Sequence, residues 1–246
     1  MPDQPAQQPP AVQKLRVRYA KRGRLRFTSH RDFGRALERA VRRAGLPIAY
    51  SSGFSPHPRI SYANASSTGA ASEAEYFEVS LAESVDPEVV RAALDAALPP
   101  GLDIVDVVTA GPGALADRLE ASRWEILLPE AAPDEVAAAV STFLAQDTVE
   151  VERMTKRGPR RFDCRAAVLV LSARADVGEA GPCVILEMVV RHGTPAVRPD
   201  DILAGLRLIA GLVLPVPPVQ TRIEQGPLDP QTGSVMDPLD PDRDAS

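Results

Sequence analysis

The sequence has few cysteines, few aromatic residues and no long apolar run. Two cysteines occur among its 246 residues, Cys164 and Cys183, which disfavours disulfide scaffolds, CxxC zinc sites and iron–sulfur ligation by clustered cysteines. No stretch reaches the roughly 18 apolar residues that a membrane helix needs. The Gln- and Pro-rich first ten residues are not typical of a signal peptide. We therefore expect a cytoplasmic protein that does not engage a membrane.

Common nucleotide-binding and catalytic motifs are also missing. The sequence contains no GxxxxGKS, GxxxxGKT or GxGxxG phosphate loop, and no GxSxG or HExxH signature. It is 44% hydrophobic and 25% charged, which is ordinary for a globular protein. Only 4% of the residues are aromatic, so alanine, valine and leucine are expected to fill the core. The sequence predicts neither a bound cofactor nor a metal site.

Positive charge is concentrated near the N-terminus. The whole chain has a net charge of −5, but residues 14–59 contain 13 lysines and arginines against two acidic residues, a net charge of +11. Such asymmetry favours a polyanionic partner. A solvated, arginine-rich face explains the same numbers, and charge alone does not separate the two readings.

The order of predicted elements indicates two similar halves. Residues 13–110 and 111–225 each follow a β-α-β-β-α-β pattern, with one extra strand in the second half, which predicts an α+β protein of two tandem ferredoxin-like domains with antiparallel sheets. An irregular loop is expected over 51–72, and long loops are often functional. The ends, 1–12 and the acidic 226–246, have the composition of disordered tails.

The clearest local prediction is an amphipathic helix that follows two short strands, 15–19 and 24–27. Thr28-Ser29 supplies an N-cap, and Gly45 ends the helix. Apolar residues recur at i, i+3, i+4, i+7, i+8 and i+11, from Phe33 to Ala44, and predict one buried face. The opposite face carries Arg31, Arg35, Arg39 and Arg42, which we expect to contact phosphates.

Further candidate binding residues lie in and after the loop. Exposed aromatics beside arginines suit stacking on unpaired bases, so we expect nucleotide contacts from the loop. Two glutamates that follow the loop are expected either to contact a base edge or to pair with Arg59. These candidates are Tyr50, Phe54, His57, Arg59, Glu73 and Glu75. His30, at a helix N-terminus, is the candidate general base, and a structural turn histidine is the alternative.

Several of these segments resemble one known family. The runs FTSHRD (27–32), YSSGFSPHPRIS (50–61) and SEAEY (72–76) are similar to the radical-SAM-linked (radical-SAM-associated) protein family, a domain of unknown function. The resemblance implies a protein fused to, or encoded beside, a cobalamin-binding radical SAM enzyme. This chain has no CxxxCxxC motif, so the resemblance implies a stand-alone accessory form with such an enzyme as partner.

Three functions follow as hypotheses. The first is an accessory RNA-binding protein, with transfer RNA as one candidate, that presents or recognises the substrate of a radical SAM enzyme. The second is a metal-independent ribonuclease with His30 as base, by analogy of fold with CRISPR RNA-processing endonucleases. The third is a protein–protein adaptor whose arginine face docks an acidic surface without nucleic acid. The sequence leaves the oligomeric state open.

Overall fold

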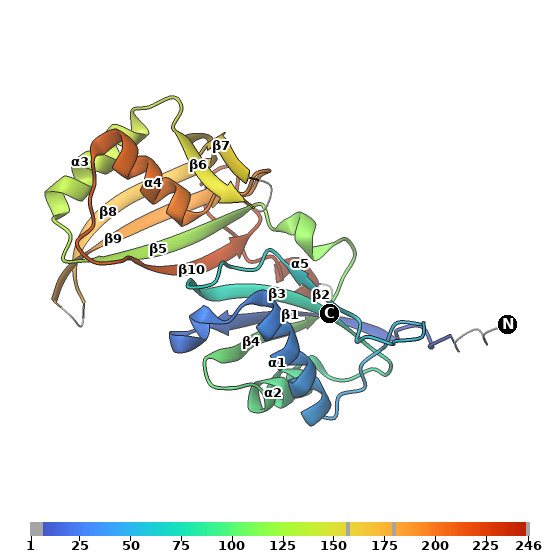
Figure 1. Ribbon diagram of the computed structural model, residues 1–246. Helices are drawn as coiled ribbons and strands as arrows, with labels where there is room; N and C mark the ends of the chain where they lie inside the picture. The colour runs from blue at the N-terminus through green and yellow to red at the C-terminus, as the bar shows by residue number, and fades with distance from the viewer. Residues whose placement is uncertain (1–6, 156–157, 179–180, 245–246) are drawn as a thin grey trace. The chain divides into compact units, whose positions relative to one another are not determined.

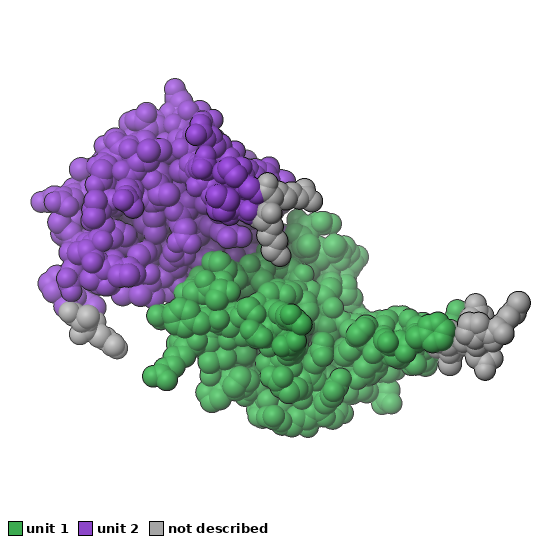
Figure 2. All heavy atoms as spheres, viewed as in Figure 1, with its two compact units in different colours: residues 1–118, 238–246 green, residues 119–237 purple. Residues whose placement is uncertain are grey.

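The computed structural model describes residues 7–155, 158–178 and 181–244. The chain folds as two compact units, which Figure 2 distinguishes by colour: unit 1 is residues 1–118 with 238–246, and unit 2 is residues 119–237. Both units combine helices with antiparallel strands, so the expected α+β class is confirmed. Within the described ranges, no helix has the length and apolar composition needed to cross a bilayer.

Unit 1 has two helices on one face of an antiparallel sheet with the strand order β4-β1-β3-β2 (Figure 1). Apolar residues of α1 and α2, among them Phe33, Leu37 and Leu94, pack against Leu15 and Phe77 of the sheet. The elements are β1 (Gln13–Lys21), η1 (Gly23–Phe27), α1 (His30–Arg43), β2 (Ile60–Ala63), β3 (Ala71–Leu81), α2 (Pro87–Ala97), β4 (Leu102–Thr109), η2 (Leu115–Arg118) and α5 (Asp240–Arg243).

Unit 2 repeats this arrangement with an inserted hairpin. Its sheet has the order β10-β5-β9-β8, and α3 and α4 lie on one face of it (Figure 1). Strands β6 and β7 form a separate two-stranded sheet. The elements are β5 (Ala121–Pro129), α3 (Pro133–Leu144), β6 (Glu150–Thr155), β7 (Gly158–Asp163), η3 (Arg165–Ala167), β8 (Val168–Gly178), β9 (Gly181–Arg191), α4 (Pro199–Ala210) and β10 (Val219–Gly226).

Two local predictions in unit 1 are wrong. Residues 23–27 form a 3-10 helix instead of a strand, because Leu25 turns into the core and Phe27 turns out to solvent. The region 51–72 is not irregular throughout, because β2 forms within it and pairs with β3. The hairpin 51–59 before β2 remains a loop, closed by a bridge between Tyr50 and Pro58.

The expectation of a disordered tail over 226–246 is also wrong for its described part. Strand β10 extends to Gly226, Leu228 pairs with Val235, and helix α5 returns to unit 1. Leu239 is fully buried and Asp242 is 1% exposed. At the other end, residues 7–12 form no helix or regular strand, and residues 1–6 of the expected N-terminal tail lie outside the described residues.

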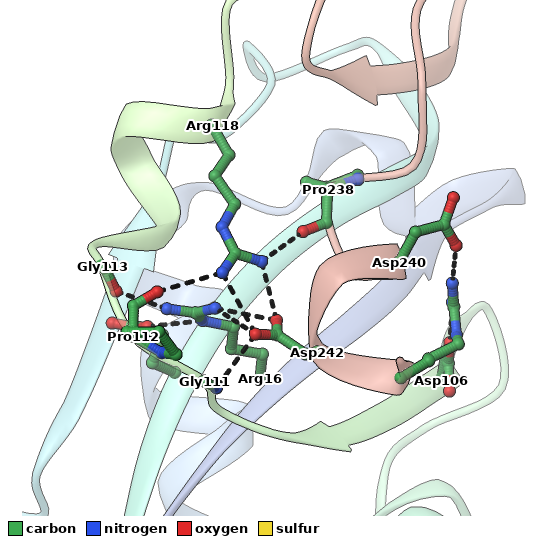
Figure 3. A network of polar contacts seen from close by, with 11 residues as sticks. Arg16, Asp106, Gly111, Pro112, Gly113, Arg118, Pro238, Asp240 and Asp242 are labelled. Atoms are coloured by element: carbon green, nitrogen blue, oxygen red, sulfur yellow. Dashed lines mark hydrogen bonds and ion pairs between the residues drawn. The ribbon is translucent and has the colours of Figure 1, made fainter. Parts of the chain in front are cut away.

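The C-terminal segment is held by a buried network of ionic contacts (Figure 3). The Asp242 carboxylate accepts hydrogen bonds from Arg16 at 2.7 and 2.8 Å, from Arg118 at 2.9 and 3.1 Å, and from the Gly111 amide at 2.9 Å. Arg16 is fully buried and also contacts Glu78 at 3.0 Å. Burial by itself would raise the pKa of Asp242, but the hydrogen bonds from the two guanidinium groups hold that pKa below its usual value.

Candidate functional site

Helix α1 presents a row of arginines on the face opposite its buried face. Ser29 caps the helix by accepting a hydrogen bond from the Asp32 amide, as the sequence predicts. The buried residues are Phe33, Leu37, Ala40 and Val41, and the exposed cations are Arg31, Arg35, Arg39 and Arg42. At 3.6 residues per turn, these four arginines fall within about 80° of the circumference and span about 16 Å of the axis. We call them the α1 arginine row.

The positive charge of the α1 arginine row is not neutralised by acidic side chains of the described residues. None of its four guanidinium groups has an ion pair or a side-chain hydrogen bond to any residue in the described part of the chain. The helix carries two acidic residues. The Asp32 carboxylate accepts a hydrogen bond of 2.7 Å from the Ser29 hydroxyl, and Glu38 forms no ion pair with any described residue. Four exposed guanidinium groups are therefore available to an anionic partner.

The first part of the basic segment is used inside the fold instead. Lys14 and Arg16 both pair with Glu78, at 2.6 and 3.0 Å, and Arg22 pairs with Glu73. Part of the +11 charge of residues 14–59 is therefore neutralised within the fold, and this net charge overstates what the surface displays. Cations of the segment that have no ion pair among the described residues include Arg24, Arg26, Arg31, Arg35, Arg39, Arg42, Arg43 and Arg59.

Four predicted contact residues lie in or next to the hairpin 51–59, of which one is partly buried and three are exposed. Tyr50 is partly buried against the core, and it closes the hairpin opposite Pro58. The His57 carbonyl accepts a backbone hydrogen bond of 2.9 Å across the loop, which ties its two sides together. Phe54 is 79% exposed, and His57 and Arg59 are also exposed. An aromatic ring, an imidazole and a guanidinium are thus displayed on a braced loop.

The two glutamates expected to read base edges are engaged within unit 1. Glu75 is 1% exposed, and its carboxylate accepts a hydrogen bond of 2.8 Å from the Ser66 amide. Glu73 is partly exposed and pairs with Arg22. A buried carboxylate cannot reach a base, so the assignment of Glu75 is corrected to a structural role. Glu73 reaches solvent only as half of an ion pair.

His30 lies at the exposed start of α1, with its ring against an aromatic cluster. The imidazole meets the Tyr62 ring edge-on, with centroids 4.8 Å apart, and Tyr62 in turn contacts Phe33 at 5.9 Å. Burial raises the pKa of Tyr62 to about 12, and the nearby Glu38 carboxylate adds to this shift. The described residues place no hydrogen-bond partner on the His30 ring. The imidazole is therefore exposed at the first residue of α1 and has no orienting hydrogen-bond acceptor among the described residues.

His192 is a residue whose environment the sequence did not reveal. The Leu119 carbonyl lies 2.7 Å from Nδ1 and the Ser122 hydroxyl 2.6 Å from Nε2, so Nδ1 donates to the carbonyl and Nε2 accepts from the hydroxyl. Burial lowers the pKa of His192, which favours this neutral form. The ring lines an open cavity of about 810 Å³ beside Arg191 and the turn at 228–233. No sequence signal exists, because histidine and serine are 70 residues apart.

Metal ligation has no candidate in the described part of the chain. No group of three or more histidine, cysteine, aspartate or glutamate side chains lies there in an arrangement that could hold an ion. Both cysteines are buried as free thiols. Cys164 packs in unit 2, where burial raises the pKa of its thiol to about 12.

Comparison with known protein families gives one match. Residues 14–199 match the family described as "Uncharacterized protein conserved in bacteria (DUF2344)". The chain belongs to this family. The matched region contains the α1 arginine row, the hairpin 51–59 and His192. The search of curated proteins returned no match. The family fixes no activity, so the function has to be argued from the exposed groups.

Proposed function

We propose that this family member is an accessory RNA-binding protein whose α1 arginine row contacts the phosphate backbone. The observation that carries the proposal is the absence of any ion pair to this row within the described residues, although the chain as a whole is acidic. Guanidinium groups bind phosphate oxygens with two parallel hydrogen bonds, so a row of them suits a phosphate chain. Transfer RNA is the first candidate ligand.

The hairpin 51–59 supplies the second part of this proposal. Phe54 is 79% exposed, so most of its ring is accessible to a ligand, and covering an apolar ring is favourable. Together with His57 and Arg59 it would hold a nucleotide by stacking and by charge. Arg35 and Phe54 belong to the same compact unit, so the RNA contacts that we propose all lie in unit 1.

The partner that we propose is a radical SAM enzyme that modifies RNA. This part of the proposal rests on the resemblance of the 27–32, 50–61 and 72–76 segments to the radical-SAM-linked family. The chain's two cysteines, Cys164 and Cys183, are both buried, so a cluster and its chemistry would come from the partner. In this arrangement the present chain recognises or presents the RNA, in the cytoplasm, and the enzyme acts on it.

We also propose that each unit is a ferredoxin-like domain. The element order β1-α1-β2-β3-α2-β4 with the sheet order β4-β1-β3-β2 supports this for unit 1. In unit 2, β5, β8, β9 and β10 take the corresponding places once the β6–β7 hairpin is set aside. Such a fold hosts many functions, so it supports the architecture and does not decide the activity.

The test is the salt dependence of binding to total transfer RNA. The double variant Arg35→Gln/Arg39→Gln is compared with Arg191→Gln/Arg207→Gln, which removes the same charge from exposed arginines of unit 2. Each lost phosphate contact should reduce the slope of log K against log salt by about 0.7–0.9. We expect a loss of about 1.4–1.8 for the α1 pair and little change for the control pair. Equal slopes for the two variants, or no binding at low salt, would reject the proposal.

Two measurements separate the alternative hypotheses. Purification from native cells, followed by nuclease treatment, shows whether a protein partner stays bound. A partner that binds without nucleic acid, combined with no affinity for transfer RNA, would favour the adaptor. RNA cleavage in the presence of EDTA that disappears in His30→Ala would favour the ribonuclease. For the accessory role we expect RNA to be bound and left intact.

A further inference from the structure

Phe27, directly before helix α1, is a large apolar side chain that the fold leaves uncovered. It is 59% exposed, although it lies between Leu25, which is partly buried against the core, and the cap of α1. The Arg26 guanidinium lies over its ring, 4.8 Å from the ring centroid. Arg26 has no ion pair in the described part of the chain, so this stacked pair combines an aromatic face with an uncompensated charge.

The backbone fixes this pair in an outward position. Residues 23–27 form a 3-10 turn in which the Leu25 amide bonds to the Arg22 carbonyl at 3.0 Å and the Thr28 amide bonds to the Leu25 carbonyl at 2.9 Å. The Gly69 amide donates to the Arg26 carbonyl at 2.8 Å and ties the turn to the loop before β3. Since Leu25 occupies the inward position, Phe27 cannot reach the core without breaking these bonds.

The pair also stands at one end of the α1 arginine row. Phe27 precedes Arg31, the first member of the row, by four residues, with only the Ser29 cap and the start of the helix between them. A nucleic-acid strand whose phosphates follow the row would reach the exposed ring at its end. A strand with free bases could stack one of them there, whereas a duplex keeps its base faces inside the helix.

We propose that Arg26 and Phe27 form a stacking platform for an unpaired base, and that the ligand of this site is therefore single-stranded or looped RNA. This inference rests on the proposed RNA-binding function and narrows its substrate class. An acidic protein surface would satisfy the arginine row by charge, but it gives no reason for a fixed, exposed phenyl ring stacked under a guanidinium. The flat face of a nucleobase matches both groups.

The test compares Phe27→Leu with the wild type on two fluorescent RNAs of equal length, one single-stranded and one a closed duplex. Leucine keeps the apolar volume and removes the π face. We expect Phe27→Leu to weaken single-strand binding by roughly 5-fold to 100-fold, with duplex binding within about 2-fold of the wild type. The salt slope should not change, because no charge is removed. Phe27→Trp keeps an aromatic face and should bind the single-stranded RNA with about the affinity of the wild type.

The controls keep this outcome distinct from that of the proposed function. Val89→Ala trims another exposed apolar residue of unit 1, 56% exposed, and should leave both affinities unchanged. Equal single-strand affinity for Phe27→Leu and the wild type, or preference of the wild type for the duplex, would overturn the platform while RNA binding stands. If the wild type binds neither RNA at low salt, the proposed function fails and the platform fails with it.

Discussion

Replacing Asp242 by asparagine should destabilise unit 1 strongly, although the residue lies only four positions before the last residue of the chain. The substitution would place an amide where the carboxylate receives two guanidinium groups and the Gly111 amide, and it would leave Arg16 buried with less compensating charge. Breaking a buried ion pair by removing one partner costs about 3–5 kcal/mol. Because Arg16 keeps Glu78 and the Gly113 carbonyl, we expect the lower end, about 3 kcal/mol.

The assay is thermal unfolding followed by circular dichroism. For a chain of this length, 1 kcal/mol corresponds to about 2–4 °C, so the Tm of Asp242→Asn should fall by about 6–12 °C. Asp240→Asn is the matched control, since Asp240 lies on the same helix but its side chain is 63% exposed. The control should shift the Tm by no more than about 2 °C. Equal and small shifts in the two variants would refute the argument that the C-terminal segment is held by a buried charge.

Three further predictions follow from the packing and the titratable groups. A Cβ at Gly205 would lie 2.9 Å from Phe143 Cε2, so Gly205→Ala should cost about 1–3 kcal/mol in urea unfolding. Since the pKa values of Asp242 and Glu78 are lowered in the folded state, the stabilisation from these carboxylates is complete only above about pH 5, clear of their unfolded pKa values, and it is lost progressively as the pH falls further. Asp242→Asn should flatten this acid loss. Because Cys164 is fully buried and its pKa is raised to about 12, iodoacetamide should label it only on unfolding; rapid labelling of the native protein would contradict that burial.

Helix α1 shows what a single sequence can predict. Its apolar residues recur at helical spacing, a serine stands at its N-cap, and Gly45 follows its end with a positive φ of 63°. All these signals lie within about 17 residues, so local physics determines the element and the face that carries the arginines. The same holds for α2, where Asp86 caps a helix that begins at Pro87.

Strand β1 and the C-terminal segment show why the rest was missed. Alternation of Leu15 and Val17 with Arg16 predicts a strand with one solvent-exposed face, but Arg16, which should lie on that face, is fully buried. Its partner Asp242 is 226 residues away, and no local pattern marks such a pair. Glu75 was missed for a different reason: it is buried and accepts a hydrogen bond from the Ser66 amide, and the alternation of its strand marks no such contact with the preceding loop. Sequence periodicity reports the faces of elements, and it cannot report which distant segment covers them.

Chemical footprinting of the α1 arginine row tests the central claim most directly. The protein is treated with a glyoxal reagent that modifies accessible arginines, with and without total transfer RNA, and each site is quantified by mass spectrometry. Bound RNA should protect Arg31, Arg35, Arg39 and Arg42, and it should leave the exposed Arg207 of unit 2 as reactive as before. Unchanged modification of the row in a sample shown to contain bound RNA would contradict the account.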